Sequence, residues 1–287
     1  MKQMKFFIGL SALTMVLLSC KGRVGEAQVE QADGFYGAPV ANSQQTKVKD
    51  QTEKAKVVRL YEIPAPLKDR PEQILHRRGY TTSYNQTTKT PNWVAWHLTA
   101  AHTKGRVQRS QEVFMEDEDI AQGQRATDND YYNSRYDRGH MCPAGDNKWD
   151  PLAMTQSFLF TNICPQNHGL NKYEWNDLEM LCRDWARKYG AVDIVCGPLF
   201  ATGGEQKTIG RNKVWVPYAF FKVVLCRQGT PKAIGFVYRN EGKKQAMADA
   251  VRCVDDIERL TKMDFFPELD DKTETKIEAT ANLSDWQ

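Results

Sequence analysis

Residues 137–144 read DRGHMCPA, and residues 161–179 read TNICPQNHGLNKYEWNDLE. Both stretches contain side chains suited to phosphate chemistry. Hydrolysis of a phosphodiester needs a base for water, a cation on the phosphate and a group that stabilises the leaving oxygen. His140 is a candidate base, because the unperturbed pKa of histidine is about 6.5. Asn171 and Glu179 offer oxygen atoms of the kind that Mg²⁺ prefers.

The second stretch also predicts a helix from Asn171 to about Lys188. Apolar residues recur there at steps of three or four, and Gly190 then stops the pattern. On such a helix Asn171 and Glu179 lie along one side, two turns apart. Asn171 would lie near the helix start, where free amides favour phosphate, or it would serve as the N-cap. Trp175 falls in the apolar stripe and is expected in the core.

Two arginines are candidates for holding the phosphate through paired donors. They are Arg138, within the first stretch, and Arg109, upstream of it. Arg106 lies nearby, and Arg109 is preferred for its spacing to Phe114 and Asp117. Each candidate has an ordinary alternative, since an Asp–Arg pair is often a surface ion pair of little energetic value. A histidine outside a helix is usually a polar surface residue or a hydrogen-bonded core residue.

Taken together, these residues resemble the DNA/RNA non-specific endonuclease family, which includes secreted bacterial nucleases and mitochondrial endonuclease G. The resemblance is carried by Asp137-Arg138-Gly139-His140, Asn162, Pro165-Gln166, Asn171, Trp175 and Glu179. It continues through Cys196-Gly197-Pro198-Leu199-Phe200, Val216-Pro217, Phe220-Phe221-Lys222-Val223 and Ile257-Glu258 to Phe265-Phe266-Pro267. The resemblance thus covers roughly residues 61–269.

This resemblance implies an α+β, ββα-metal nuclease fold, in which a β-hairpin and a crossed helix frame one metal. A central mixed or antiparallel sheet flanked by helices is expected. The apolar pattern itself predicts strands over 93–98, 157–163, 192–196, 219–225 and 233–238. A further short helix is predicted over 251–262. One mixed α+β domain is the simplest account of this order.

The resemblance also implies catalytic roles. His140 would be the general base, and Arg109 and Arg138 would steady the phosphate. Asn162 would lie beside His140 on the paired strand and help to fix it. Water would attack phosphorus and leave 5′-phosphate and 3′-hydroxyl ends on DNA or RNA. Little sequence preference is expected, because contacts to the phosphate backbone supply most of the binding energy.

The implied metal is Mg²⁺, with Mn²⁺ as an alternative. By the resemblance, Asn171 would be its only direct protein ligand, and Glu179 would orient the waters that fill the other positions. Two other functions stay open: a non-catalytic nucleic-acid-binding lipoprotein on the same fold, and a metal-dependent phosphoesterase that acts on small nucleotides. A zinc protease is disfavoured, because no H-E-x-x-H segment is present.

The first residues predict export and attachment to a membrane. Lysines precede the apolar run Phe6–Leu18, and Leu17-Leu18-Ser19-Cys20 resembles the bacterial lipobox. We therefore expect a lipoprotein signal peptide over 1–19 and a lipid on Cys20, with a plain signal peptide as the alternative. Lys21 favours the bacterial outer membrane over the inner one, and either face of that membrane fits.

Four segments follow from this pattern: the signal peptide, a flexible polar tether over 20–56, an endonuclease domain over 57–270 and a loose polar tail over 271–287. Hydrophobic residues make up 41% and charged residues 26%, which is ordinary for a globular protein. The net charge of +3 tolerates a polyanionic partner without identifying one. The sequence does not predict an oligomeric state.

Export also changes how the other cysteines are interpreted. They are Cys142, Cys164, Cys182, Cys196, Cys226 and Cys253. An even number permits disulfides, although the sequence does not give the pairing and buried thiols are the alternative. Cys142 and Cys164 lie on two segments that are expected to pair, so a bridge between them is possible in principle.

Overall fold

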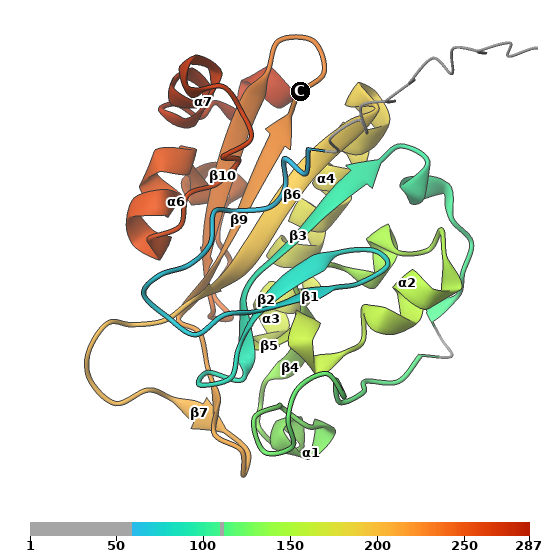
Figure 1. Ribbon diagram of the computed structural model, residues 1–287, viewed down its shortest axis with the longest axis vertical. Helices are drawn as coiled ribbons and strands as arrows, with labels where there is room; N and C mark the ends of the chain where they lie inside the picture. Colours follow the sequence, from blue (N-terminus) through green and yellow to red (C-terminus); the bar gives the residue numbers. More distant parts are fainter. Residues whose placement is uncertain (1–58, 110–111) are drawn as a thin grey trace, which may run out of the picture. The chain divides into compact units, whose positions relative to one another are not determined.

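The computed structural model of the protein describes residues 59–109 and 112–287 (Figure 1). The predicted signal peptide, the lipid on Cys20 and the tether over 20–56 lie outside the described residues. Among the residues that are described, no helix combines the length and the apolar character needed to cross a membrane.

The chain alternates between strands and short helices. The strands are β1 (Gln73–His76), β2 (Thr81–Asn85), β3 (Thr90–Thr99), β4 (Asp137–His140), β5 (Ile163–Gln166), β6 (Ala191–Leu199), β7 (Thr208–Ile209), β8 (Val214–Trp215), β9 (Ala219–Cys226), β10 (Lys232–Arg239) and β11 (Val251–Arg252). The α-helices are α1 (Asp128–Tyr131), α2 (Pro151–Gln156), α3 (His168–Lys172), α4 (Glu174–Tyr189), α5 (Met247–Ala250), α6 (Val254–Thr261) and α7 (Asp271–Glu278). Short 3₁₀ helices are η1 (His102–Lys104), η3 (Ala144–Asp146), η4 (Phe160–Asn162) and η5 (Leu283–Trp286).

Seven strands form one sheet in the order β1-β2-β3-β6-β9-β10-β11. Every neighbouring pair in it is antiparallel. β4 and β5 form a separate antiparallel pair, which is followed directly by α3 and α4. This α+β architecture, with an antiparallel sheet flanked by helices, confirms the predicted fold class, and β4, β5 and α4 supply its ββα unit.

The large sheet is buried on both faces. Side chains alternate along β3, so that Val94 and Trp96 enter the core shared with α4, whereas Trp93 and Ala95 enter the core shared with α6 and α7. Figure 1 shows α4 along one face of the sheet and α6 and α7 along the other. Double burial explains why these strands read as apolar runs rather than as polar–apolar alternation.

The strands predicted over 93–98, 192–196, 219–225 and 233–238 are confirmed as β3, β6, β9 and β10. The strand predicted over 157–163 is wrong. That segment is mostly turn and 3₁₀ helix, and the extended part begins only at Ile163. Asn162 explains the difference, because its side chain bonds to the backbone in the place of a neighbouring strand.

The single helix predicted from Asn171 to Lys188 is two helices. α3 ends at Lys172, and Tyr173, with φ −113° and ψ −88°, separates it from α4. Asn171 and Glu179 therefore lie on different helices. Asn167 caps α3 by accepting a hydrogen bond from the Gly169 amide, so Asn171 is not the N-cap. Trp175 is in the core, as predicted.

The C-terminal segment also differs from its prediction, since it is folded rather than loose. It contains α7 and η5, in which Ile277 and Trp286 are buried. The helix predicted over 251–262 begins at Val254, after a short edge strand. Cys142 and Cys164 do not form a bridge. Both are free thiols buried in the core, which was the alternative that the sequence left open.

Candidate active site

A pocket of about 470 Å³ lies where the end of β4 meets η3, α3 and α4. It is lined by Arg109, Asp137, Arg138, His140, Pro143, Ala144, Gly145, Lys148, His168, Asn171, Lys172, Asn176, Glu179 and Arg183. Five of the six predicted site residues are in that list, and the exception is Asn162. Side chains from segments far apart in the sequence are thus brought to one place.

The DRGH segment forms β4, and its glycine has a steric reason. Gly139 pairs with Cys164 on β5, and a Cβ added to it would lie 2.3 Å from the side-chain oxygen of Gln166. Only glycine allows this close approach without displacing Gln166, which is itself fully buried. The β4–β5 pairing therefore fixes the position of the His140 side chain in the pocket.

His140 is 7% exposed and lies between two aromatic rings. Its ring centroid is 4.9 Å from that of Phe158 and 5.4 Å from that of Phe114. Its Nε2 has no hydrogen-bond partner among the described residues. Burial lowers the pKa of His140 to about 3, and the nearby charge of Arg109 acts in the same direction. The imidazole is therefore neutral at pH 7 and able to accept a proton.

Asn162 lies beside β4 but does not contact the imidazole through a hydrogen bond. Its side chain accepts from the Cys142 amide at 2.9 Å and donates to the carbonyl oxygens of Cys142 and Ser157, both at 2.8 Å. Its backbone oxygen accepts from the Met141 amide. Asn162 thus holds the backbone that follows His140, which is a more indirect position than the sequence predicted.

Asn171 is oriented by Asp137. The amide nitrogen of Asn171 donates to Asp137 Oδ2 at 2.9 Å, and His168 Nδ1 lies 2.9 Å from the same oxygen. Because the amide nitrogen is engaged, the side-chain oxygen of Asn171 is left for another partner. A carbonyl oxygen offered to the pocket in this way suits a hard cation such as Mg²⁺.

Glu179 projects from α4 into the same pocket. Burial raises the pKa of Glu179 to about 7, while the positive charge of Lys222 opposes this shift. Lys222 comes from β9 and is fully buried, with its Nζ 4.4 Å from the ring centroid of Trp175. The Lys222 ammonium has no hydrogen-bond partner among the described residues. Lys222 therefore places positive charge near Glu179 from within the core.

The two predicted arginines differ in whether they form an ion pair. Arg138 Nε donates to Asp128 at 2.6 Å, and its guanidinium lies 5.6 Å from the ring centroid of Phe114. Arg109 is exposed and forms no ion pair with a described residue. Its guanidinium lies 5.6 Å from the ring centroid of Phe158. Both arginines thus rest on the aromatic rings that enclose the histidine.

Six further polar side chains of the pocket were not predicted as site residues: Asp137, Lys148, His168, Lys172, Asn176 and Arg183. Arg183 donates to the buried Asp146 at 2.8 Å, and Trp96 Nε1 donates to the other oxygen of Asp146. The four-residue spacing from Glu179 to Arg183 on one helix was a usable signal. Nothing comparable pointed to Lys148 or His168.

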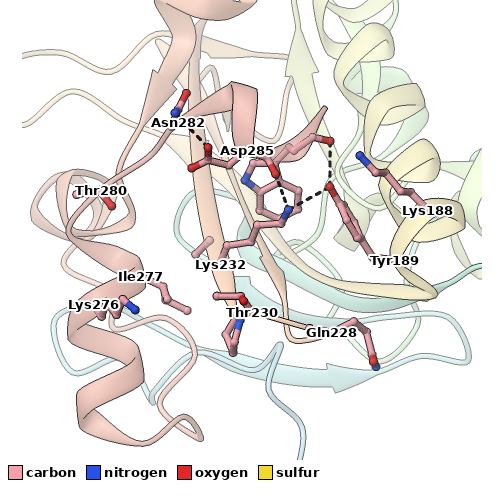
Figure 2. A pocket seen from close by; sticks show the side chains of 14 residues that line it. Lys188, Tyr189, Gln228, Thr230, Lys232, Lys276, Ile277, Thr280, Asn282 and Asp285 are labelled. Carbon is pink, nitrogen blue, oxygen red and sulfur yellow. Dashed lines mark hydrogen bonds between the residues drawn. The ribbon is translucent and has the colours of Figure 1, made fainter.

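A second hollow, of about 760 Å³, lies near the C-terminal segment and holds no predicted site residue (Figure 2). Two of its three lysines are engaged. Lys232 Nζ donates to Tyr189 Oη at 3.0 Å and to the Asp285 carbonyl oxygen at 2.6 Å. Lys188 donates to the carbonyl oxygen of Gln287. These bonds attach the C-terminal residues to α4 and β10. We therefore interpret the hollow as a gap beside the packed C-terminal segment.

Comparison with known proteins gives a consistent result. A family model described as DNA/RNA non-specific endonuclease matches residues 60–272. Nuclease EXOG, mitochondrial, from Danio rerio is 38% identical over 216 residues, which are 69% of this chain and 63% of that protein. Nuclease C1 from Cunninghamella echinulata var. echinulata is 36% identical over 213 residues, which are 69% of this chain and 84% of that protein.

A solved structure agrees with these sequence matches. The crystal structure of an EndoG/EndoGI complex contains a chain that is 28% identical, with a TM-score of 0.69 over 74% of this chain and 91% of that one. The present chain spans less than two thirds of the zebrafish nuclease, so more than a third of that protein has no counterpart in the match.

The comparisons contradict the predicted cellular location. Matching proteins from zebrafish, human and yeast are named as mitochondrial nucleases, so the prediction of a bacterial outer membrane is wrong. No finding supports a lipid on Cys20 either. The physical reason is that a short apolar run after lysines marks a targeting segment in general and does not identify the membrane.

Proposed function

This chain belongs to the DNA/RNA non-specific endonuclease family, and on that premise we propose that it is a metal-dependent hydrolase of DNA and RNA. The activity is assigned to the domain predicted over 57–270. Cleavage would occur within strands and with little regard for sequence. The products would carry 5′-phosphate and 3′-hydroxyl ends.

One observation carries the proposal. A neutral histidine, an oriented amide oxygen and a carboxylate face one pocket, and two arginines lie at its aromatic wall. Such a set can supply a base, an oxygen-rich cation site and positive charge for a phosphate. A protein that only bound nucleic acid would need the arginines but not the buried base.

The residues fit Mg²⁺, with Mn²⁺ as an alternative. Asn171 would be the direct ligand, because Asp137 engages its amide nitrogen and leaves the oxygen available. Glu179 would hold waters of the metal's shell. When bound, Mg²⁺ supplies positive charge that stabilises the departing 3′ oxygen.

The protein groups act on the attacking water and on the phosphate. His140 accepts the proton of the water that attacks phosphorus. The anionic phosphate of a bound substrate favours the protonated imidazole and so raises the pKa of His140 from its low value. Arg109 and Arg138 donate to non-bridging oxygens as negative charge develops there. Phe114 and Phe158 exclude water from the ring and hold its plane.

Digestion of supercoiled plasmid and total RNA tests the proposal. We expect loss of both substrates with Mg²⁺, no loss with a chelator, and no loss with His140→Ala in either buffer. Full cleavage in the chelator, or full cleavage by folded His140→Ala protein, would contradict it. A gel shift of DNA without any cleavage would identify a binding protein instead.

A second assay separates the nuclease from a phosphoesterase that acts on small nucleotides. Oligonucleotides from 2 to about 30 residues would be digested under the same conditions. A nuclease whose arginines contact flanking phosphates should act faster on the longer substrates. Faster action on dinucleotides than on long strands would favour the phosphoesterase.

A further inference from the structure

Three carboxylates converge on the face of the sheet opposite to α4. Asp255 and Glu258 lie on α6, and Glu278 lies on α7. One oxygen atom from each lies within 4.8 Å of the other two. Figure 1 shows the two helices next to each other beside β9 and β10. The active-site pocket lies on the other side of the sheet, so these carboxylates are not part of it.

Glu278 is buried in a way that calls for a partner. It is 4% exposed, and its Oε1 has no hydrogen-bond partner among the described residues. Burial of a carboxylate is costly unless it is paired or bound to a metal. Glu258 is better satisfied, because it accepts from the Phe265 amide at 2.8 Å.

The charged groups around Glu278 are negative rather than positive. Asp264 and Glu274 are the other charged groups that act on Glu278, and with burial they raise its pKa to about 9. Within residues 59–109 and 112–287, none of the five carboxylates forms an ion pair with lysine, arginine or histidine. A bound proton or a bound cation is therefore needed to neutralise the cluster.

We propose that Asp255, Glu258 and Glu278 bind one calcium ion, which ties α7 to α6. Calcium lies 2.3–2.6 Å from its oxygen ligands, so two oxygens on the same ion are at most about 5 Å apart. The limit of 4.8 Å fits this geometry. The 4.8 Å limit admits either ion, and calcium is assigned because it accepts flexible coordination, whereas Mg²⁺ demands a near-ideal octahedron at 2.0–2.1 Å. Waters complete the shell on the partly exposed side of α6.

The site would be structural. Calcium binding would fix α7 and, through it, the chain end that carries Trp286 into the core. This proposal does not depend on catalysis, so it survives if the chain proves not to be a nuclease.

Thermal melts of the full chain in the Asn171→Ala background test the site, because that substitution removes the proposed active-site metal ligand. Calcium at about 100 times its Kd should raise Tm by on the order of 5 °C. Isothermal titration should give one ion per chain. Glu278→Gln should abolish the rise, and Glu205→Gln, which removes an exposed carboxylate from the loop between β6 and β7, should retain it.

The proposal would be overturned by the absence of a calcium-dependent rise in Tm, or by an equal rise in Glu278→Gln. An equal rise with Mg²⁺ at the same concentration would overturn the assignment to calcium. If Glu278→Gln does not fold, Asp255→Asn replaces it in the comparison, because Asp255 is only half-buried. Unchanged calcium response in that variant would equally contradict the proposal.

Discussion

At the scale of single residues, the surroundings of His140 keep its imidazole neutral, which is the form that a general base needs before substrate binds. Its ring is buried between Phe114 and Phe158, and an arginine lies nearby. These surroundings disfavour the imidazolium form, so the free protein keeps the ring unprotonated. The phosphate that substrate brings is the group that reverses this preference.

Replacement of His140 by alanine should reduce cleavage by about 10²–10⁴-fold, which is the usual loss for a general base. His168 is the only other histidine in the pocket, and it is paired with Asp137. His168→Ala should therefore cost less than about 10-fold. Initial rates on plasmid DNA, with circular dichroism to verify folding, measure both. A large loss in His168→Ala with an active His140→Ala would reverse the assignment.

The low pKa of His140 also predicts how stability depends on pH. Between pH 3 and about 6.5 the unfolded chain binds a proton at this residue and the folded chain does not. The free energy of unfolding should therefore fall as pH falls through that window, by at most about 5 kcal/mol from this group. Above pH 6.5 the effect should vanish.

Denaturant titrations of wild type and His140→Gln between pH 4 and pH 8 measure this effect. The variant should show a shallower loss of stability at acid pH, because glutamine does not titrate. The two curves should run in parallel above pH 6.5. Parallel curves over the whole range would mean that folding does not lower the pKa of His140.

Single residues also show where prediction from sequence stops. His140, Asn171 and Glu179 were predictable, because their types and spacing match one chemistry and one family. The role of Asn162 was not, because its three hydrogen bonds to backbone depend on a turn that replaced the expected strand. Lys222 lies within an otherwise apolar strand, and nothing in the local sequence indicates that its charge reaches Glu179.

At the scale of elements, the break at Tyr173 separates the two proposed metal-binding side chains. Asn171 is fixed by Asp137 of β4, whereas Glu179 is fixed by the packing of α4 on the sheet. A periodic pattern could not reveal this break, because residues 171–174 contain neither glycine nor proline, the residues that usually mark the end of a helix in a sequence. Each group can therefore be altered without moving the other.

This separation leads to a prediction about the metal. Asn171→Ala removes the proposed direct ligand and should shift the Mg²⁺ concentration for half-maximal cleavage upward by at least about 10-fold. Glu179→Gln keeps hydrogen-bonding atoms for water, so it should slow turnover with a smaller shift. The test is to measure the cleavage rate of both variants against Mg²⁺ concentration, with thermal melts as a control for folding. An unchanged metal curve in Asn171→Ala would place the metal elsewhere.

At the scale of the whole described domain, the C-terminal segment packs against α4 and completes the core there. The ring centroid of Trp286 lies 4.4 Å from that of Trp185, and the Trp286 carbonyl oxygen accepts from Tyr189 Oη. The sequence around Trp286 is otherwise polar, which is why a loose tail was predicted. A single tryptophan in a polar stretch gives no periodicity, so only the fold reveals its burial.

Trp286→Ala should therefore destabilise the protein by about 3–5 kcal/mol, as expected for loss of a buried tryptophan. In a domain of this size, Tm should fall by roughly 6–20 °C. Leu260→Ala, at a residue that is 53% exposed, is the matched control and should change Tm by less than about 2 °C. Equal melts of the two variants would show that the segment does not dock in solution.

The last prediction concerns the charge of the molecule in binding nucleic acid. The net charge is only +3, so we expect the attraction to come from the local grouping of Arg109, Lys148 and Lys172 at the pocket rather than from the whole surface. Contacts to phosphate release counterions, and each one adds about −0.9 to the slope of log K against log salt concentration. Arg109 forms no ion pair with a described residue and is free to make such a contact.

We therefore expect Arg109→Ala to reduce that slope by about 1 and to weaken binding equally for all sequences. Arg259→Ala, on α6 and away from the pocket, should leave the slope unchanged. The measurement is fluorescence anisotropy with duplexes of random, AT-rich and GC-rich sequence, between about 50 and 200 mM KCl, in the inactive His140→Ala background. A strong preference for one duplex that persists at every salt concentration would indicate contacts to base edges, which carry sequence information that phosphate contacts lack.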